Sequence, residues 1–227
     1  MVMTDRDNAL WQQCWRDQQT DFHQASVNSL LTKFWVALEL GEGSRVFVPL
    51  CGMSLDMIWL AEQGHEVIGV ELSPIAVRAF FRENYLEPVR TQVGAFDRWQ
   101  SGKLSILCGD YFSLTKEDIG QVDAVYDRAS LTALAEGVRG RYVAQLRSLV
   151  PDTCKIFLLT IEDADAWETA DHALASADEI NALYSTDFDV AMEYVESDCD
   201  TDPDSSDEAS LRTTHKVYRL SPKSGAK

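Results

Sequence analysis

The sequence predicts an α/β protein with a doubly wound, Rossmann-like, seven-stranded mixed sheet, helices on both faces and an antiparallel C-terminal hairpin. Three observations predict this fold class. Runs such as IFLLTI at 156–161 are apolar at almost every position, as in parallel strands buried on both faces. Strand-like and helix-like segments alternate from residue 44 onward. The last two strand-like segments have no convincing helix between them, so they should pair antiparallel.

The N-terminal end, over residues 8–40, predicts two helices. Apolar side chains of the first helix are Leu10, Trp11, Cys14 and Trp15. Apolar side chains of the second recur at helical spacing and are Val27, Leu30, Leu31, Phe34 and Leu38. Two glycines shortly after Leu38 end the second helix.

Seven strands are expected along the rest of the chain. They cover residues 45–50, 65–72, 103–110, 121–129, 154–162, 188–197 and 214–221. The expected helices among them cover residues 54–64, 73–84, 137–150 and 176–185. Ser54 and Ser73 are suited to cap the first two of these helices, and Pro74 suits a first helical position. The first five strands should be parallel, and we find no internal repeat and no second domain.

The composition indicates a single cytoplasmic domain, residues 1–227, with 45% hydrophobic residues to form its core. The formal net charge of −17 opposes a phosphate backbone and an anionic bilayer. We therefore expect no nucleic-acid partner and no membrane partner, and the charge favours a monomer. No stretch reaches the roughly 20 apolar residues of a membrane span, and the N-terminus lacks the blocks of a signal peptide.

Cysteines and acidic residues do not form a metal-site pattern. The five cysteines include no C-x-x-C spacing, which indicates free thiols in a reducing compartment. The acidic run 196–208 has three aspartates at alternate positions, but Pro203 and Ala209 occupy positions where an EF-hand requires Gly and Glu. We expect no metal, and we interpret residues 197–210 as an acidic, mobile hairpin loop.

The turn after the first strand is the first candidate ligand site, because open parallel sheets bind ligands beyond the carboxyl ends of their strands. It contains Leu50, Cys51 and Gly52. A pyrophosphate needs several glycines for close backbone approach, and this turn has one. The single glycine argues against a nicotinamide dinucleotide, although a plain strand-to-helix turn remains an alternative interpretation.

Acceptors for a nucleoside follow the second and third strands. Glu71 lies 19 residues after Gly52 (71 − 52 = 19), where a carboxylate can accept hydrogen bonds from both ribose hydroxyls. Asp110 can accept from the exocyclic amine of adenine, and Tyr111 can cover a ring face. The alternatives are a solvated acid before a helix, a loop aspartate and a core aromatic. Taken together, the residues favour a nucleoside without phosphates, and S-adenosylmethionine (S-adenosyl-L-methionine) is the common cofactor of that description.

Asp127 and Arg128 end the fourth strand, where a transferred group would lie. Arg128 can pair with an anionic substrate atom, and we expect Asp127 to orient Arg128. The alternative is an ion pair with no role in the reaction. Arg128 is the candidate catalytic residue, and we expect no acid–base pair.

Three stretches of the sequence resemble the thiopurine S-methyltransferases. The first, VPLCG.S.DM.WLA..GH.V.GVELS, covers residues 48–73. The others are IG..DA.YDR at 119–128 and W....T.FHQ, which ends at Gln24. The PLCG segment and its continuation separate this family from most class I methyltransferases, whose corresponding loop is richer in glycine. The resemblance covers about residues 11–160.

The resemblance implies a role for each candidate residue. Leu50 and Gly52 would lie along the methionine part of the cofactor, Glu71 would hold the ribose, and Asp110 with Tyr111 would surround the adenine. Arg128 would stand near cofactor and substrate. The segment Trp11 to Phe22, within the helical N-terminal lid or cap segment of residues 1–40, would fold over the cofactor as a lid. Its contact residues would be Trp11, Trp15 and Phe22.

The expected function is methyl transfer from S-adenosylmethionine to the sulfur of an aromatic or heterocyclic small-molecule thiol. Selenium or tellurium compounds are alternative acceptors, because residues 162–178 lack the Gly-Pro-Pro-Phe-like loop of the family. Met53 also replaces a lysine that members tend to have after PLCG. A nicotinamide-dependent oxidoreductase and a non-catalytic, methyltransferase-like scaffold are the competing hypotheses.

Overall fold

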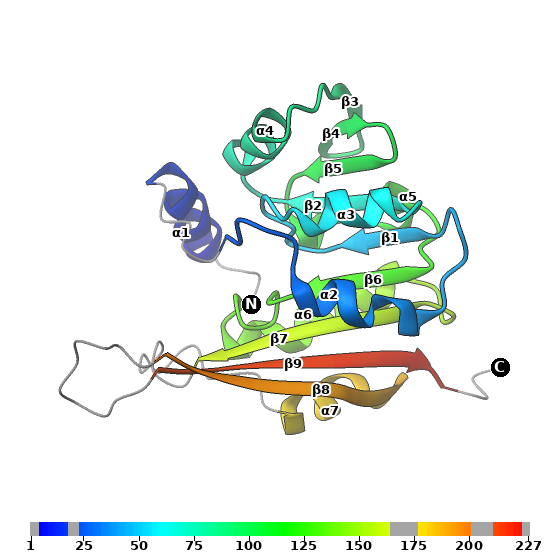
Figure 1. Cartoon of the computed structure of the whole chain (residues 1–227). Helices are drawn as coiled ribbons and strands as arrows, with labels where there is room; N and C mark the ends of the chain where they lie inside the picture. Colours follow the sequence, from blue (N-terminus) through cyan, green and yellow to red (C-terminus); the bar gives the residue numbers. More distant parts are fainter. Residues whose placement is uncertain (1–4, 18–22, 164–176, 201–210, 224–227) are drawn as a thin grey trace.

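The computed structural model describes residues 5–17, 23–163, 177–200 and 211–223, and a sheet of nine strands runs through these residues (Figure 1). The strands, in chain order, are β1 (Arg45–Val48), β2 (Glu66–Glu71), β3 (Val89–Val93), β4 (Phe96–Ser101), β5 (Leu104–Cys108), β6 (Ala124–Arg128), β7 (Lys155–Asp163), β8 (Phe188–Asp200) and β9 (Leu211–Pro222). Their order across the sheet is β3-β4-β5-β2-β1-β6-β7-β9-β8.

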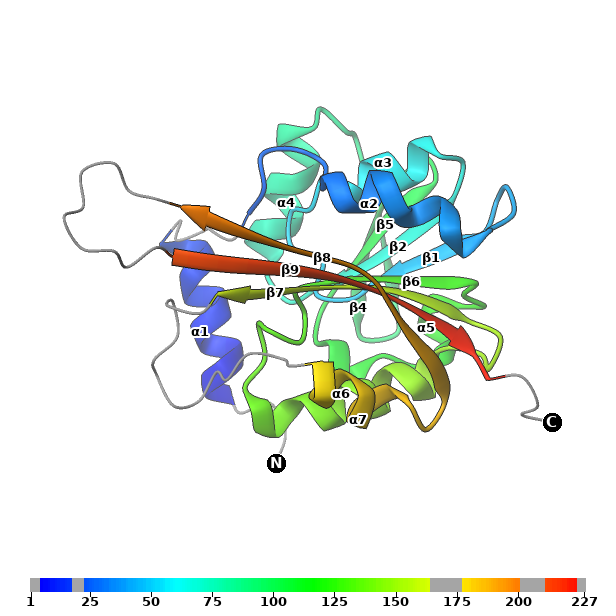
Figure 2. The ribbon, with the colours of Figure 1, turned by 60° about the horizontal axis from the view of Figure 1, so that its bottom comes forward.

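Helices connect the strands and cover both faces of the sheet. The α-helices are α1 (Asp5–Arg16), α2 (Ser29–Phe34), α3 (Asp56–Glu62), α4 (Pro74–Glu83), α5 (Lys116–Ile119), α6 (Glu136–Leu149) and α7 (Ala177–Tyr184). Two short 3₁₀ helices are η1 (Trp35–Leu38) and η2 (Tyr111–Ser113). Figure 2 shows α2, α3 and α4 on one side of the sheet and α5, α6 and α7 on the other. None of the described helices is long and apolar enough to cross a membrane.

The parallel centre of the sheet confirms the predicted fold class. β5, β2, β1, β6 and β7 pair parallel in that order. Successive residues of β1 enter opposite cores, since Val46 and Val48 pack with α2, α3 and α4, whereas Phe47 packs with α6 and α7. The chain runs outward from β1 through β2 to β5 and returns to β6 on the other side of β1. In sheets of this kind ligands bind at such a reversal, which here is at the carboxyl ends of β1 and β6.

The prediction of seven strands was wrong, because β3 and β4 form an additional antiparallel hairpin against β5. Both segments are largely polar and β3 is an edge strand, so neither shows the apolar run of a buried strand. Gly94 has a φ of +54° and makes their tight turn possible. Trp99 anchors the hairpin by stacking on Phe81, with 5.9 Å between the ring centroids.

The sequence around α3 and α4 explains where these helices begin. Ser73 caps α4 as predicted, because its hydroxyl accepts a hydrogen bond from the Ala76 amide at 3.4 Å, and Pro74 follows at the first helical position. Helix α3 begins later than expected. Leu55 occupies the N-cap position, and the Ser54 hydroxyl accepts from the Asp56 amide at 3.3 Å. Ser54 and Asp56 are thereby fixed at the carboxyl end of β1.

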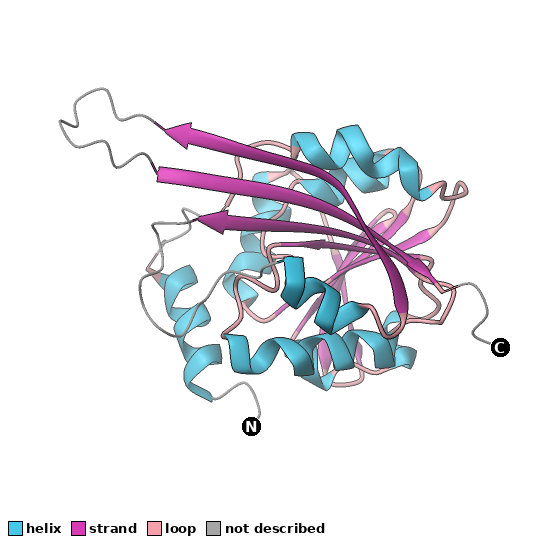
Figure 3. Cartoon of the chain, turned by 90° about the horizontal axis from the view of Figure 1, so that it is seen from below, coloured by secondary structure: helices cyan, strands magenta, loops and turns pink. Residues whose placement is uncertain are grey.

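The C-terminal hairpin is antiparallel as predicted, with β9 paired to both β7 and β8 (Figure 3). The expected loop boundary at residue 197 was wrong, because strand pairing continues from Ser197 to Asp200 opposite Leu211–Thr214. An edge strand accepts polar residues, so the acidic composition did not end the strand. The expected mobile loop therefore reduces to residues 201–210, which lie outside the described residues.

Candidate active site

The turn after β1 has an unusual backbone. Leu50 and Gly52 both adopt positive φ angles, +46° and +53°. This conformation is uncommon for leucine, and such outliers gather at ligand sites. The Cys51 amide donates to the Val70 carbonyl at 3.0 Å and ties the turn to β2. The turn is therefore held at the strand ends with its main chain close to Glu71.

Glu71 ends β2 and its carboxylate is held by two main-chain donors. The Gly52 amide donates to Oε2 at 3.0 Å, and the Ser73 amide donates to Oε1 at 2.7 Å. The residue is only 7% exposed. Burial raises the pKa of Glu71 to about 7, against the lowering effect of these main-chain donors. A carboxylate accepts through both of its oxygens, so the group suits a pair of neighbouring hydroxyls.

Helix α1 lies over the glycine turn. A Cβ atom built on Gly52 would be 3.4 Å from Cζ2 of Trp15, and Trp15 is buried. Trp11 is partly buried and packs against the core cluster that contains Leu131 and Leu134. Figure 1 shows α1 at the end of the sheet toward which the arrowheads of β1, β2 and β6 point. The structure thus brings two predicted lid residues to the strand ends, while Phe22 lies outside the described residues.

Asp110 and Tyr111 follow β5 and open η2. The Asp110 carboxylate accepts from the Phe112 amide at 3.0 Å and so caps this short helix. The structure contradicts the interpretation that the Tyr111 ring is free to cover a ligand. The ring is 2% exposed and stacks on Tyr142 at 4.8 Å, and its hydroxyl donates to the Tyr142 carbonyl at 3.0 Å. Only the main chain of Tyr111 remains a candidate contact.

The partner of Arg128 is Asp56, and the expectation that Asp127 orients Arg128 was wrong. Arg128 Nε donates to Asp56 Oδ2 at 3.0 Å, and Nη2 donates to Ser54 Oγ at 3.3 Å. Neighbouring residues of a strand point to opposite faces, so Asp127 enters the other core. There it is fully buried and accepts from the Tyr142 hydroxyl at 2.6 Å. Burial raises the pKa of Asp127.

Ser54 and Asp56 are the site residues that sequence reasoning missed. Both stand at the start of a predicted helix, where a serine and an acid already have an ordinary explanation as a cap and a dipole partner. The available signal was their place within the PLCG.S.DM segment. Met53, which replaces the lysine expected there, is partly buried against the core cluster that contains Met57 and Leu60.

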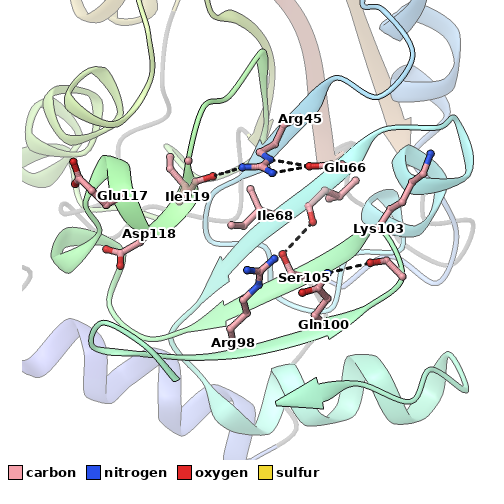
Figure 4. Close-up of a pocket in the computed structure, with 13 residues that line it drawn as sticks. Arg45, Glu66, Ile68, Arg98, Gln100, Lys103, Ser105, Glu117, Asp118 and Ile119 are labelled. Carbon is pink, nitrogen blue, oxygen red and sulfur yellow. Dashed lines mark hydrogen bonds and ion pairs between the residues drawn. The ribbon is translucent and has the colours of Figure 1, made fainter. Parts of the chain in front are cut away.

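A cavity of about 340 Å³ lies at the opposite end of the sheet (Figure 4). Arg45 and Glu66, which begin β1 and β2, form an ion pair of 2.7 Å in its wall. The charged lining residues are Arg45, Arg98, Lys103, Glu66, Glu117 and Asp118. Because cations and carboxylates are equal in number, the lining favours no ligand charge. In the described ranges, no group of three or more histidine, cysteine or acidic side chains could hold a metal ion.

Comparison with known proteins identifies the family. The family model described as "Thiopurine S-methyltransferase" matches residues 6–223. The chain belongs to the thiopurine S-methyltransferase family. A thiopurine S-methyltransferase of Stutzerimonas stutzeri is 57% identical over 221 residues, covering 97% of this chain and 93% of that protein. One of Nitrosospira multiformis is 43% identical over 182 residues, covering 80% and 83%.

Solved structures show the same fold at low sequence identity. A methyltransferase of Anabaena variabilis, described as S-adenosylmethionine-dependent, has a TM-score of 0.63 and 12% identity, covering 95% of each chain. The 1,6-didemethyltoxoflavin-N1-methyltransferase of Burkholderia thailandensis, solved with S-adenosylhomocysteine, has a TM-score of 0.59 and 17% identity, covering 94% of this chain and 87% of that one.

Family membership makes the protein an enzyme with S-adenosylmethionine as its cofactor, and it does not favour the nicotinamide alternative. The residues at the strand ends fit this cofactor. The Glu71 carboxylate is buried at the end of β2, beside the Gly52 amide. The turn below Trp15 contains one glycine, Gly52. These features suit a ribose and an amino-acid chain better than a pyrophosphate.

Proposed function

We propose that the enzyme transfers the methyl group of S-adenosylmethionine to the sulfur of an aromatic or heterocyclic thiol. The main observation that supports this reaction is the match of the family model to residues 6–223. The Glu71, Gly52 and Arg128 arrangement at the carboxyl ends of β2, β1 and β6 supports it. Thiopurine is the acceptor class in the names of the relatives, and selenium or tellurium anions are the second candidate acceptors.

The proposal assigns cofactor contacts to the residues at the strand ends. Glu71 accepts from the ribose hydroxyls, Asp110 and the main chain of Tyr111 lie beside the adenine, and Leu50 with Gly52 lies along the methionine part. The lid residues Trp11, Trp15 and Phe22 cover the cofactor and exclude water. Their support is the packing of Trp15 over Gly52.

S-adenosylmethionine supplies a methyl group on a sulfonium, which is already a good leaving group. The protein therefore has to align the acceptor and exclude water more than it has to move protons. Arg128 is the residue that we assign to stabilise the anionic sulfur, because its guanidinium donates to Ser54, two residues after Gly52. Asp127 takes no proton in this proposal, because it is buried on the other face with Tyr142. An aromatic thiol ionises more readily than a cysteine thiol, whose pKa is roughly 8.5. No general base is therefore needed.

We further propose a monomer that works in the cytoplasm without nucleic-acid or membrane partners. The support is the net charge of −17, which opposes anionic surfaces and self-association. Four cysteines, Cys14, Cys51, Cys108 and Cys154, are free thiols, as in a reducing compartment. Sedimentation at several protein concentrations tests the monomer, and a mass that rises with concentration contradicts it.

A methyl-transfer assay with labelled cofactor tests the function across aromatic thiols, selenite and tellurite. We expect transfer to at least one aromatic thiol, with a higher kcat/KM than for the chalcogen anions. Transfer to selenite or tellurite alone would contradict the aromatic thiol as acceptor and establish the chalcogen anions instead. Cofactor binding without transfer to any acceptor would instead support the scaffold hypothesis.

The affinity for S-adenosylmethionine should rise as the pH increases through about 7. The pKa of Glu71 is raised to about 7, and only the ionised carboxylate accepts from both ribose hydroxyls. Binding below this pH must release the proton, so Kd should increase by up to about tenfold for each pH unit of acidification. Calorimetric titrations at a series of pH values measure this, and Glu71→Gln should bind weakly with a flat profile. A wild-type Kd independent of pH across this range would refute the assigned role.

A further inference from the structure

Asp56, the first residue of α3, collects hydrogen bonds from two separate parts of the chain. Its Oδ2 atom accepts from Arg128 Nε at 3.0 Å and from the Tyr126 hydroxyl at 2.7 Å, both on β6. Its Oδ1 atom accepts from the Asn28 amide at 2.8 Å. The residue is 1% exposed. A buried carboxylate with three donors is fixed in one position.

The ion pair with Arg128 is largely removed from water. The side chains of Arg128 and Asp56 are 13% and 2% exposed. A buried pair is weak evidence for stability, because desolvation offsets the attraction, but it requires a defined geometry to persist. The bond to Asp56 engages Nε, and the bond to Ser54 engages Nη2. The guanidinium is therefore held along the edge that carries Nε and Nη2.

The same carboxylate also holds the point where the N-terminal segment joins the body of the protein. Asn28 caps α2, because its side-chain oxygen accepts from the Leu30 and Leu31 amides at 3.0 and 3.3 Å. Its own amide donates to Asp56. Helix α1, with Trp15 over Gly52, precedes this cap in the chain. Asp56 thus connects the anchor of the proposed lid with the proposed catalytic arginine.

We propose that Asp56 is a positioning residue that orients Arg128 toward the methyl acceptor. Through its bond to the Asn28 amide it also fixes Arg128 relative to the N-terminal segment. The inference rests on the proposed function, since Arg128 is the group through which Asp56 acts. It predicts that Asp56 affects turnover only while Arg128 is present. A purely structural carboxylate would affect the protein equally with or without the arginine.

A double-mutant cycle of Asp56→Asn and Arg128→Met tests this dependence. Asp56→Asn should lower kcat for thiol methylation by about 10- to 100-fold, with a change of less than threefold in the KM for S-adenosylmethionine. In the Arg128→Met background it should cause no further loss of kcat. Equal losses in both backgrounds would overturn the proposal.

Tyr142→Phe is the matched control, because it removes a buried tyrosine-to-aspartate hydrogen bond of the same kind on the opposite face of β6. It should lower thermal stability and leave kcat within about threefold of wild type. Should Asp56→Asn not fold, Asp56→Glu retains the charge and moves the carboxylate by one methylene. A loss of kcat in Asp56→Glu supports the positioning role, and full kcat overturns it.

The Nε–H signal of Arg128 in the ¹⁵N NMR spectrum separates failure of this inference from failure of the proposed function. In the wild type it should be shifted and protected from exchange by the bond to Asp56. It should move toward the position of the exposed arginines in Asp56→Asn or Asp56→Glu. An unchanged signal overturns the inference even if the enzyme methylates thiols. A changed signal in a protein that methylates no thiol supports the positioning and refutes the function.

Discussion

Replacing Glu71 by alanine is expected to weaken S-adenosylmethionine binding by roughly 100- to 20,000-fold. The substitution removes the acceptor for two ribose hydroxyls, and each hydrogen bond to a charged group contributes about 1.5–3 kcal/mol. It also leaves the Gly52 and Ser73 amides without their carboxylate partner. Because Gly52 is held by that bond, the glycine turn should loosen as well. Calorimetric titration with S-adenosylmethionine or S-adenosylhomocysteine measures the loss.

Glu66→Ala is the matched control for this experiment, because Glu66 begins the strand that Glu71 ends. Glu66 is exposed and pairs with Arg45 at the other end of the sheet. Its loss should cost about 1 kcal/mol of stability or less and leave cofactor affinity unchanged. If the Glu71→Ala protein binds the cofactor as tightly as the Glu66→Ala protein does, Glu71 is not a cofactor-binding residue.

Replacing Arg128 by methionine is expected to lower kcat/KM for an aromatic thiol by about 100-fold, comparable to the loss of one anion-stabilising donor at other active sites. The loss should be larger for thiols of higher pKa, because they depend more on a cation to ionise in the site. Cofactor affinity should change much less. Steady-state kinetics across thiols of graded pKa, together with cofactor titrations, measure both effects.

Stability must be measured beside these rates, because Arg128→Met leaves the buried Asp56 without its cation. Breaking such a pair commonly costs about 3–5 kcal/mol. Arg128→Lys keeps the charge but lacks the planar fork whose one edge, Nε and Nη2, binds Asp56 and Ser54. It should retain an intermediate kcat. If folded Arg128→Met is as active as the wild type, another group must stabilise the anionic sulfur.

The parallel centre of the fold was predictable because its signals are local and strong. Strands such as β7 are buried on both faces and appear as unbroken apolar runs, and Ser73-Pro74 marks the start of α4. The β3–β4 hairpin was not predictable in this way. Its strands are mostly exposed, and it is stabilised by contacts of Trp99 with side chains that are distant in sequence.

Candidate site residues were predictable from the sequence where their place at a strand end is enough to bring them together. Glu71 and Gly52 lie at strand ends that the fold brings together, and the structure joins them by a 3.0 Å hydrogen bond. Side-chain partners were not predictable, because they depend on which face a residue enters. Asp127 and Arg128 are adjacent in sequence yet point into opposite cores. The partner that Arg128 does bind, Asp56, lies 72 residues earlier in the chain.

The position of a transferred methyl group tests the central claim most directly. A thiopurine offers both sulfur and ring nitrogens to a methyl donor. Turnover with S-adenosylmethionine carrying a ¹³C-labelled methyl group, followed by NMR of the product, distinguishes an S-methyl from an N-methyl product. We predict an S-methylated product, formed at a rate that falls in both Glu71→Ala and Arg128→Met. A label on nitrogen, or no labelled product from an enzyme that binds the cofactor, would contradict the account.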